Sequence, residues 1–433
     1  MNTVPLYAGI DDTDSPHGMC TTYVGAVAIQ RLQRLGCTLL DFPKLIRLNP
    51  CWPQKTRGNC AVAFLVSCPP DQVSEVKEIV LKTVEELAEK DDRTNPGVAF
   101  MSKKTPPEDL VTFAYRVVRD IVDLKEAESM ANKLGIETHK FRAGNGVIGA
   151  LAAIGHPLTN DFTYELVAYR TPKNRGKPRK VDPDSVKRMD KLTSPLTFDN
   201  LDPWTGEIRI TPHTPCPVLY GIRGESPAVL KKAHQLVKTG EPIERVQIFK
   251  TNQGTDEHLV SAKIAEVSPL RSYSIEGEIA SKPRIIAGGH VIVEICDSTG
   301  TIHCAAYEPT RIFRRVVKQL IPGDRVIVHG GVKQKPSLPL TLNLEKIEIL
   351  ELAKKTVKRN PKCPKCGKRM KSEGRGKGYV CKKCKERAPP TAATIEELSR
   401  EIRVGKFEVP PRARRHLAKP LQRELAVKSI IEF

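Results

Sequence analysis

The sequence predicts a multi-domain α+β protein. Helical and strand-like segments alternate over residues 5–250, which is typical of α/β or α+β modules. A run of short strands follows over residues 271–352, and a basic segment with paired cysteines comes after it. These changes in pattern place the predicted domains at residues 1–135, 136–265, 270–352, 354–388 and 389–433.

The first predicted module mixes strands and helices. Its clearest helix covers residues 71–89, where Val73, Val76, Val80 and Val84 recur near a spacing of 3.6 residues. The strands are expected at residues 5–12, 38–48, 60–66 and 98–101. The other helices are expected at residues 18–35 and 110–134, the second of them with a break.

The second predicted module is compatible with a ferredoxin-like βαββαβ unit. The expected elements are a helix at residues 147–154, strands at 162–170 and 207–222, a helix at 227–238 and a strand at 244–250. A basic, proline-rich stretch, Thr171–Asp184, interrupts them, and we expect it to be an exposed loop.

Residues 271–352 are predicted to form an OB-fold β-barrel. Apolar residues such as Tyr273, Ile275 and Ile279 alternate with polar ones. Five short strands with one helix, Thr310–Leu320, between the third and the fourth fit that fold, and another small β-barrel is the alternative. The final segment, residues 389–433, is expected to be basic and helical, with a helix at residues 394–402.

The charge balance favours a polyanionic partner. The chain has 70 Lys and Arg residues against 50 Asp and Glu residues, and its net charge is +20. The longest apolar run, Val147–Ile154, is too short to span a bilayer, and Met1–Pro5 lacks the features of a secretion signal. We therefore expect a nucleic-acid partner rather than a membrane, and a cytoplasmic protein whose remaining cysteines stay reduced.

Two cysteine pairs near the C-terminus predict a structural zinc ribbon. Two residues separate Cys363 from Cys366 and Cys381 from Cys384, and residues 367–380 lie between the pairs. Each pair can supply two thiolates to one tetrahedral Zn²⁺, which leaves no open position for catalysis. The segment has almost no apolar core, so metal binding must supply its folding free energy. Four free thiols or a redox pair are the alternatives.

An acidic string near the N-terminus is the candidate catalytic site. Asp11, Asp12 and Asp14 follow a predicted strand, and neighbouring carboxylates repel one another unless a cation such as Mg²⁺ lies among them. Three residues at the start of the next predicted helix complete the candidate: Gly18, Thr21 and Thr22. Metal carboxylates beside a helix N-terminus suit phosphoryl transfer. The alternative is an acidic turn followed by an ordinary threonine cap.

Two further clusters are candidates for phosphate contacts. The first places cations and small residues on turns beside strands: Arg47, Asn49, Lys55, Arg57, Gly58 and Asn59. The second is a glycine turn that opens helix 147–154 and lines a pocket: Gly144, Asn145 and Gly146. A solvated hairpin is the alternative for the first cluster. A dinucleotide-binding fingerprint is disfavoured for the second, because the preceding Glu137–Arg142 is too polar for a buried strand.

Taken together, these motifs resemble those of the archaeal enzymes that synthesise 2-agmatinylcytidine in isoleucine tRNA. The resemblance covers nearly the whole chain, in family order. The matching segments are residues 9–22, 45–50, 55–59 and 144–155, the OB-fold segment and the zinc ribbon.

The resemblance implies an ATP-dependent ligase with an unusual kinase-like α/β module, a ferredoxin-like domain, an OB-fold and a zinc ribbon. Its implied reaction joins agmatine to the wobble cytidine of the isoleucine tRNA with anticodon CAU, after phosphorylation of the cytosine C2 oxygen. AUA is then decoded as isoleucine. The resemblance also implies that Thr21 is a phosphoryl acceptor.

Agmatine carries two cations, so we expect its pocket to hold carboxylates. The candidates are Asp161, Glu165 and Asp256. One rival function is non-catalytic RNA binding through the OB-fold and the ribbon, against which the grouped carboxylates argue. A second rival is an ATP-dependent tRNA modifier that uses another amine. The sequence gives no indication of oligomeric state.

Overall fold

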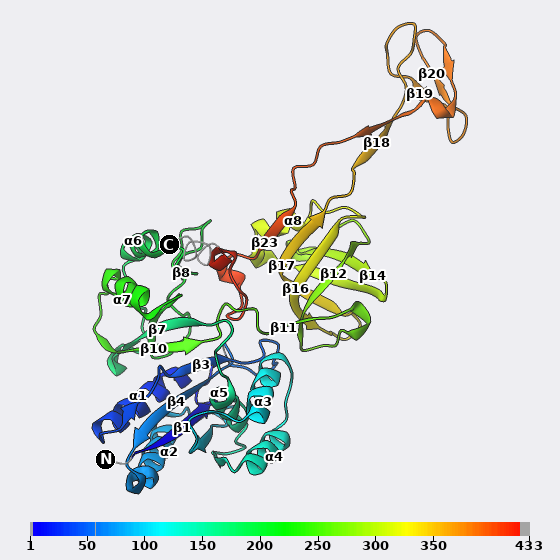
Figure 1. The fold of residues 1–433 in the computed structure, drawn as a ribbon. Coiled ribbons are helices and arrows are strands. Elements are labelled where there is room, and N and C mark those ends of the chain that lie inside the picture. The colour runs from blue at the N-terminus through cyan, green and yellow to red at the C-terminus, as the bar shows by residue number, and fades with distance from the viewer. Residues whose placement is uncertain (1–2, 57, 425–433) are drawn as a thin grey trace.

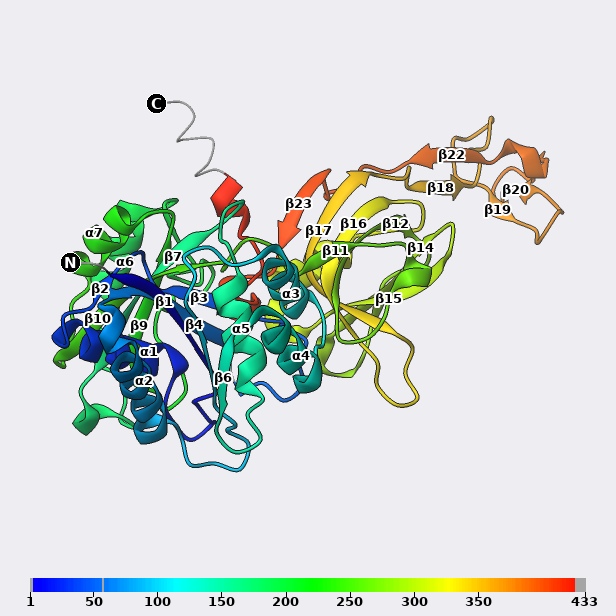
Figure 2. The ribbon, with the colours of Figure 1, turned by 60° about the horizontal axis from the view of Figure 1, so that its bottom comes forward.

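The N-terminal module is a sheet with helices on both faces (Figures 1 and 2). The computed structural model describes residues 3–56 and 58–424 of the chain. The strands of this module are β1 (Val4–Asp11), β2 (Thr38–Leu39), β3 (Lys44–Arg47), β4 (Cys60–Cys68), β5 (Gly97–Met101) and β6 (Glu137–Lys140). Its helices are α1 (Thr21–Arg34), α2 (Val73–Leu87), α3 (Glu108–Arg119), α4 (Leu124–Leu134) and α5 (Gly146–Gly155).

Alternation along β1 sends its side chains into two separate cores. Leu6, Ala8 and Ile10 belong to the core beneath α1 and α2, whereas Tyr7 belongs to the core beneath α3, α4 and α5. β1 lies between β4 and β5 and is antiparallel to both. Both faces of the strand are therefore buried, and Asp11 ends it inside the protein.

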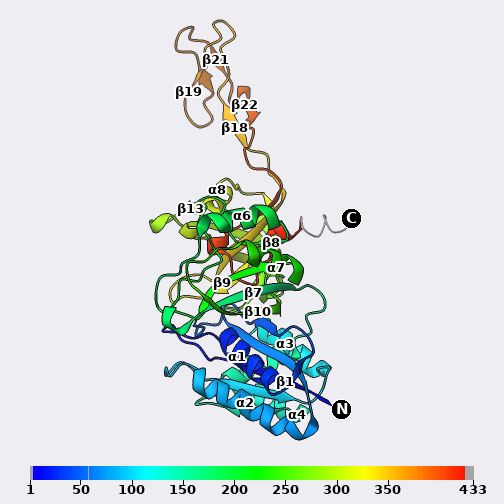
Figure 3. The same ribbon diagram turned by 90° about the vertical axis from the view of Figure 1, so that its left-hand side faces the viewer.

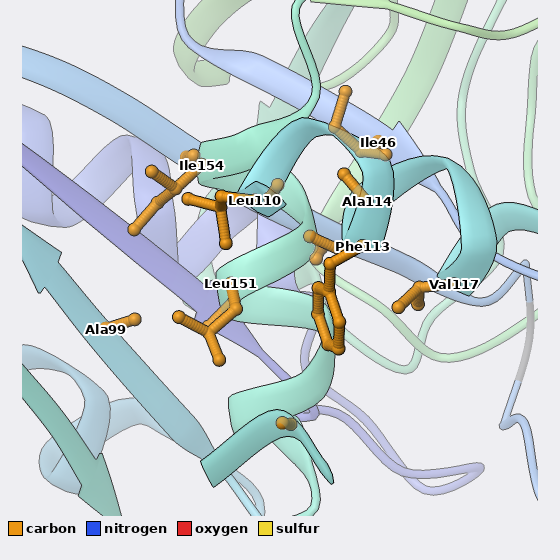
Figure 4. Packing of buried hydrophobic residues seen from close by; sticks show 14 of the residues in the cluster. Ile46, Ala99, Leu110, Phe113, Ala114, Val117, Leu151 and Ile154 are labelled. Atoms are coloured by element: carbon orange, nitrogen blue, oxygen red, sulfur yellow. The ribbon is translucent and has the colours of Figure 1, made fainter. Parts of the chain in front are cut away.

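Helix α5 packs directly against the first module. Leu151 and Ile154 of α5 lie in one buried cluster with Leu110 of α3 (Figure 4). A Cβ atom on Gly9 would lie 2.3 Å from the carbonyl oxygen of Ala150, so glycine permits this close approach of α5 to β1. The boundary that the sequence suggested at residue 135 thus lies before two elements, β6 and α5, that complete the first module.

The second module has the strand order of a ferredoxin-like unit. Its elements are β7 (Thr163–Arg170), α6 (Pro183–Thr193), β8 (Thr197–Phe198), β9 (Val218–Gly224), α7 (Pro227–Leu236) and β10 (Ile243–Thr251). The order β10-β7-β9-β8 places the fourth strand beside the first and the third beside the second. The predicted unit is confirmed, but its first helix is α6 and not the segment 147–154. Asp182 caps α6, and Pro183 occupies its first turn.

The two modules share one continuous sheet. The strand order is β6-β5-β1-β4-β3-β10-β7-β9-β8, and β2 pairs with β4. The junction is a short parallel pairing of β3 with β10, in which Lys44 and Leu45 lie opposite Lys250 and Thr251. Side chains from the first module and from β7 and β9 can therefore face the same space.

The third module is the predicted OB-fold. Its five barrel strands are β12 (Ser272–Ile279), β14 (Val291–Asp297), β15 (Gly300–Ala306), β16 (Arg325–Lys333) and β17 (Thr341–Glu351), and α8 (Ile312–Val317) lies between β15 and β16. The pairings β12–β14, β14–β15, β15–β17, β17–β16 and β16–β12 close the barrel. Two short strands, β11 (Leu259–Ser261) and β13 (Arg284–Ile285), extend it.

The cysteine-rich segment stands away from the body on a two-stranded arm (Figures 1 and 3). The arm pairs β18 (Thr356–Arg359) with β22 (Thr394–Glu397), and the ribbon contains β19 (Lys371–Ser372), β20 (Tyr379–Val380) and β21 (Arg387–Ala388). The helix expected at residues 394–402 is wrong, because residues 394–397 complete a strand pair instead. At the base of the arm, Arg400 forms an ion pair with the buried carboxylate of Asp324 in the barrel.

The chain returns from the arm as a C-terminal strap, residues 405–424. Strand β23 (Gly405–Glu408) pairs with β17, and the segment after it contacts the ferredoxin-like unit. The basic helical extension expected here is wrong for most of the described residues, which form two short strands, turns and coil, although residues 421–424 are helical. No helix in the described part of the chain is long and apolar enough to cross a membrane.

Candidate active site

A cavity of about 880 Å³ lies where the first module, the ferredoxin-like unit and the C-terminal strap meet. Asp11 from the end of β1 and Asn145 before α5 line it from the first module. Glu165 of β7 and Arg223 of β9 line it from the second, and Arg414 lines it from the strap. The cavity therefore exists only after segments distant in sequence have come together.

The three predicted carboxylates line this cavity. Asp11, Asp12 and Asp14 follow one another at the end of β1, where Asp12 adopts a left-handed backbone conformation with φ of 57°. The backbone N–H of Asp12 donates to Asp11 Oδ1 at 2.7 Å. The backbone N–H of Asn95 donates to Asp12 Oδ2 at 2.9 Å. These bonds fix the carboxylates against the sheet edge.

Burial and mutual repulsion change the acidity of this cluster. Burial raises the pKa of Asp11 well above its ordinary value, and the charges of Asp12 and Asp14 raise it further. Burial also raises the pKa of Asp12, to about 6, and Asp14 adds to that rise. A cation among the carboxylates would remove the cause of the repulsion. The cluster thus has the chemistry of a site for a hard divalent cation.

The carboxylates are too far apart to form a closed cage for a metal. Among the described residues, only the four ribbon cysteines bring three or more His, Cys, Asp or Glu ligand atoms within 4.8 Å of one another. Mg²⁺ commonly uses one or two protein carboxylates and completes its shell with water and phosphate oxygens. The open arrangement of Asp11, Asp12 and Asp14 therefore suits a metal that is shared with a phosphate substrate.

The N-terminus of α5 lies against the acidic cluster. A Cβ atom on Gly149 would lie 1.9 Å from Asp11 Oδ2, so this position accommodates only glycine. Asn145, Gly146 and Gly149 line the cavity. The first N–H groups of this ten-residue helix lie beside the carboxylates and already donate to the carbonyl oxygens of Asn95, Gly144 and Asn145. They add a positive helix end to the cavity wall.

A buried arginine, Arg47, and a half-buried arginine, Arg223, line the cavity from different modules. Arg47 and Arg223 lie on either side of Glu165, at N–O distances of 3.6 and 3.7 Å. Within the described residues, Nε of Arg47 and Nε of Arg223 each lack a hydrogen-bond acceptor. Buried guanidinium N–H groups without an acceptor are costly, and an anionic ligand would satisfy them.

The strap adds a neutral histidine beside these arginines. Arg223 donates from Nη2 to Nδ1 of His416 at 2.8 Å. Burial lowers the pKa of His416 well below its ordinary value, and the charges of Arg47 and Arg223 lower it further. His416 therefore stays uncharged and holds Arg223 in place.

Most of the predicted site residues line the same cavity. The described residues that do so are Asp11, Asp12, Asp14, Thr22, Arg47, Asn49, Lys55, Gly58, Asn59, Asn145, Gly146 and Glu165. Arg57 was also predicted, but it lies outside the described residues. Three of these side chains also have structural bonds: Asn49 Oδ1 accepts from the N–H of Cys51, Lys55 Nζ donates to the carbonyl of Pro50, and Asn59 Nδ2 donates to the carbonyl of Asn49.

Five other predicted residues are absent from the cavity lining: Gly18, Thr21, Gly144, Asp161 and Asp256. The hydroxyl of Thr21 accepts a bond from Thr13 Oγ1 at 3.1 Å in a buried position. Cys20, not Thr21, is the N-cap of α1. Asp161 pairs with Lys419 and Arg423. Asp256 pairs with Lys346 and accepts from the N–H of Lys419. Both carboxylates also lie outside the cavity lining, which argues against a role in binding agmatine there.

The sequence analysis missed the contribution of the strap and of the 209–214 loop. Strap residues Arg412, Arg414 and His416 line the cavity, as do Arg209 and His213 of the loop. No motif marked them, because a cation on a coil segment has no spacing signature. The excess of Arg residues in the final segment was the single available signal.

The four cysteines of the ribbon converge as the spacing predicted. Their Sγ atoms all lie within 4.8 Å of one another, and those of Cys366 and Cys381 are 3.6 Å apart. Zn–S bonds of about 2.3 Å in a tetrahedron require S–S distances of roughly 3.8 Å. The residues present therefore fit one Zn²⁺, with all four positions filled by protein.

The chain combines a cavity suited to phosphate with an OB-fold and a zinc ribbon. These features together define a multi-domain enzyme with nucleic-acid-binding modules. Family models support each part. The TiaS TCKD domain matches residues 7–68 and the TiaS FLD domain residues 144–258. An OB-fold nucleic acid binding domain matches residues 273–350, and the TiaS C-terminal zinc ribbon domain residues 360–402.

Full-length relatives identify the family. The chain is 48% identical over 418 residues to the isoleucine-tRNA 2-agmatinylcytidine synthetase TiaS of Pyrococcus horikoshii, with 96% of each chain covered. It is 46% identical over 421 residues to the enzyme of the same name from Archaeoglobus fulgidus, with 96% of this chain and 97% of the relative covered. The chain therefore belongs to the TiaS family of isoleucine-tRNA 2-agmatinylcytidine synthetases, a family of ligases.

Solved structures agree with this membership. The complex of TiaS with its isoleucine tRNA and ATP superposes with a TM-score of 0.88 at 44% identity. The complex of TiaS with the same tRNA, AMPCPP and agmatine superposes with a TM-score of 0.86 at 43% identity. Each comparison covers 97% of both chains.

Proposed function

We propose that this protein is an ATP-dependent enzyme that forms 2-agmatinylcytidine at the wobble cytidine of the isoleucine tRNA with anticodon CAU. The modified base would pair with A, so that AUA is decoded as isoleucine. Support comes from the relatives named for this activity and from the similar structures solved with an isoleucine tRNA, ATP and agmatine. The enzyme would act in the cytoplasm, where its tRNA substrate is found.

The observation that carries the proposal is the composition of the cavity wall. One part holds Asp11, Asp12 and Asp14 beside the N-terminus of α5, and another holds Arg47 and Arg223, whose Nε atoms are buried without an acceptor among the described residues. The carboxylates suit a metal ion, and the helix end and arginines suit phosphate oxygens. A non-catalytic RNA-binding protein has no use for buried carboxylates with raised pKa values, because they cost stability.

Phosphorylation solves the chemical difficulty of this reaction. The C2 carbonyl of cytosine is a poor electrophile, and transfer of a phosphoryl group from ATP turns its oxygen into part of a leaving group. The agmatine amine then attacks C2, the C2–O bond breaks, and phosphate leaves with that oxygen. Mg²⁺ bound by Asp12 and Asp14 would offset the negative charge of the phosphates during transfer.

A threonine at the start of α1 is the proposed intermediate acceptor of the phosphoryl group from ATP. The family resemblance points to Thr21, and the cavity lining instead contains the neighbouring Thr22. Both residues are buried in the first turn of a helix whose N–H groups favour phosphate. An acceptor role for Thr21 requires its hydroxyl to leave its bond with Thr13 and turn toward the carboxylates.

The target base must leave the anticodon loop to reach this cavity, at a cost of a few kcal/mol. The barrel and the ribbon on its arm are separate modules that can hold other parts of the tRNA. Of the three carboxylates proposed for agmatine, only Glu165 lines the cavity. We retain Glu165 as a contact for one of the two agmatine cations.

The proposal is tested by mass spectrometry of the tRNA. A CAU-anticodon tRNA is incubated with the purified protein, Mg²⁺, ATP and agmatine, and the nucleosides are then analysed. We expect an agmatine adduct of cytidine that requires ATP and is absent with putrescine or spermidine alone. ATP consumption without any nucleoside adduct would refute the proposal. An adduct formed with another amine would identify that amine, in place of agmatine, as the substrate.

A further inference from the structure

Trp204 is an exposed aromatic residue on a turn beside the cavity. Its exposed fraction is 61%, larger than that of Phe42, the other exposed aromatic among the described residues, at 37%. The turn lies between two segments that line the cavity, residues 198–199 and residues 209–214. Trp204 itself is absent from the lining and lies on the turn that connects these two lining segments.

The turn that carries Trp204 is held firmly. The carboxylate of Asp202, itself 1% exposed, accepts bonds from the backbone N–H groups of Trp204 and Thr205, both at 3.1 Å. Leu201 and Ile208 form a β-bridge across the base of the turn. These bonds hold the backbone of the turn in place, so the turn presents the exposed Trp204 from a defined position on the chain.

A cavity-lining residue clamps the same turn from the strap. Arg412 donates to Asp202 Oδ2 at 2.6 Å, to Thr205 Oγ1 at 3.1 Å and to Glu207 Oε2 at 2.8 Å. Arg412 thus bonds residues on both sides of Trp204 while its own side chain lines the cavity. The turn that carries Trp204 is therefore bonded directly to a residue of the cavity wall.

The surroundings of the turn favour a nucleic acid over a protein partner. Arg209 and Arg412 line the cavity and reach the turn, where both pair with Glu207 and Arg412 also pairs with Asp202. When one base leaves a single-stranded loop, the adjacent base loses a stacking neighbour, and an aromatic side chain can replace it. Flat aromatic surface beside cations is the usual composition of a stacking platform for single-stranded RNA.

We propose that Trp204 stacks on a nucleobase next to the target cytidine and holds the RNA at the mouth of the cavity. The inference rests on the proposed function, since it assumes that the substrate is a tRNA whose target base enters this cavity. Trp204 acts here as a positioning residue. It touches neither the reacting atoms nor ATP.

The first test compares RNA binding by three variants. The probe is a stem-loop RNA with the CAU anticodon loop. We expect Trp204→Ala to bind it roughly 5- to 150-fold more weakly, the range for loss of one stacked base, while Trp204→Phe retains most of the affinity. Leu192→Ala removes a similarly exposed apolar side chain from α6 and serves as the matched control, with unchanged affinity. ATP affinity and thermal stability of Trp204→Ala should match those of the wild type.

The second test is spectroscopic. The chain has two tryptophans, Trp52 and Trp204, so the difference between titrations of the wild type and of Trp204→Phe isolates the emission of Trp204. Stacking predicts quenching of that emission by the stem-loop and none by ATP alone. Wild-type affinity in Trp204→Ala, or no quenching assigned to Trp204, would overturn the inference. Failure of the proposed function would show separately, as absence of the cytidine adduct in the wild type.

Discussion

The zinc ribbon and the cavity illustrate opposite relations between sequence and site. The four ribbon ligands lie within residues 363–384, and their spacing alone predicted the cluster that the structure shows. The cavity draws its wall from residues as distant as Asp11 and His416. A short loop can bring its own ligands together, whereas a site between modules depends on how those modules pack.

The two regions also differ in their source of stability. The ribbon has a small buried cluster that consists of Met370, Tyr379 and two of the cysteines. The cavity is built on the large cores beneath and above the N-terminal sheet. Removal of a ligand should therefore unfold the ribbon, while removal of a cavity carboxylate should leave the fold intact and abolish the chemistry.

The largest expected effect is on the ribbon. Cys363→Ser should release Zn²⁺ and unfold this module, because structural zinc supplies on the order of 10 kcal/mol of its folding free energy. Binding of tRNA should weaken, and binding of ATP should persist. Zinc content is measured by metal analysis and tRNA affinity by filter binding. Cys296→Ser in the barrel is the matched control. A Cys363→Ser protein that retains zinc would contradict the view that the ribbon depends on this ligand for its fold.

The next largest effect concerns the carboxylates. Asp12→Asn preserves the shape of the side chain but removes a charge from the proposed metal site, and the rate of adduct formation should drop at least roughly 10²-fold. The melting temperature should fall little, because burial and the nearby charge of Asp14 already disfavour the ionised carboxylate in the metal-free protein. The control is Asp184→Asn on α6, where the side chain of Asp184 is 86% exposed. Near-normal turnover in Asp12→Asn would remove the metal assignment.

The two threonines at the start of α1 form a natural pair of probes. If Thr21 accepts the phosphoryl group, Thr21→Val should abolish adduct formation and the phosphate mass increase, while Thr21→Ser retains both in part. If Thr22 is the acceptor, as its place in the cavity lining suggests, Thr22→Val should have this effect instead. Mass spectrometry of the peptide after treatment with ATP distinguishes them. Full activity in both Val variants would exclude an acceptor at this helix start.

The smallest expected effect is on pH dependence. The pKa of Asp12 is raised to about 6, so the folded, metal-free protein favours the protonated carboxyl group. The stability that this preference contributes is fully present below about pH 4 and is lost as the pH rises through about 6. The difference is on the order of 3 kcal/mol. Mg²⁺ with ATP favours the ionised form and should raise Tm more at pH 7.5 than at pH 5. An equal rise at both values, measured by thermal melting, would argue against a metal at Asp12.

Much of the fold was predictable because local patterns follow from burial. The period of 3.6 residues predicted α2, and alternation predicted the OB-fold barrel. Errors arose where pairing with a distant segment decided the structure. Residues 394–397 form a strand because β18 lies beside them, and α5 joins the first module because Gly9 and Gly149 allow it to approach the sheet.

The sequence by itself determined the composition of each site: three grouped carboxylates, a helix start beside them and two cysteine pairs. Only the tertiary structure decided which cations face those carboxylates, which threonine lines the cavity and that Asp161 and Asp256 are neutralised by Lys and Arg side chains. Spacing fixes contacts over a few residues, because the short chain limits the distance between them. Contacts between modules depend on packing of the shared sheet and the strap, and no local pattern encodes them.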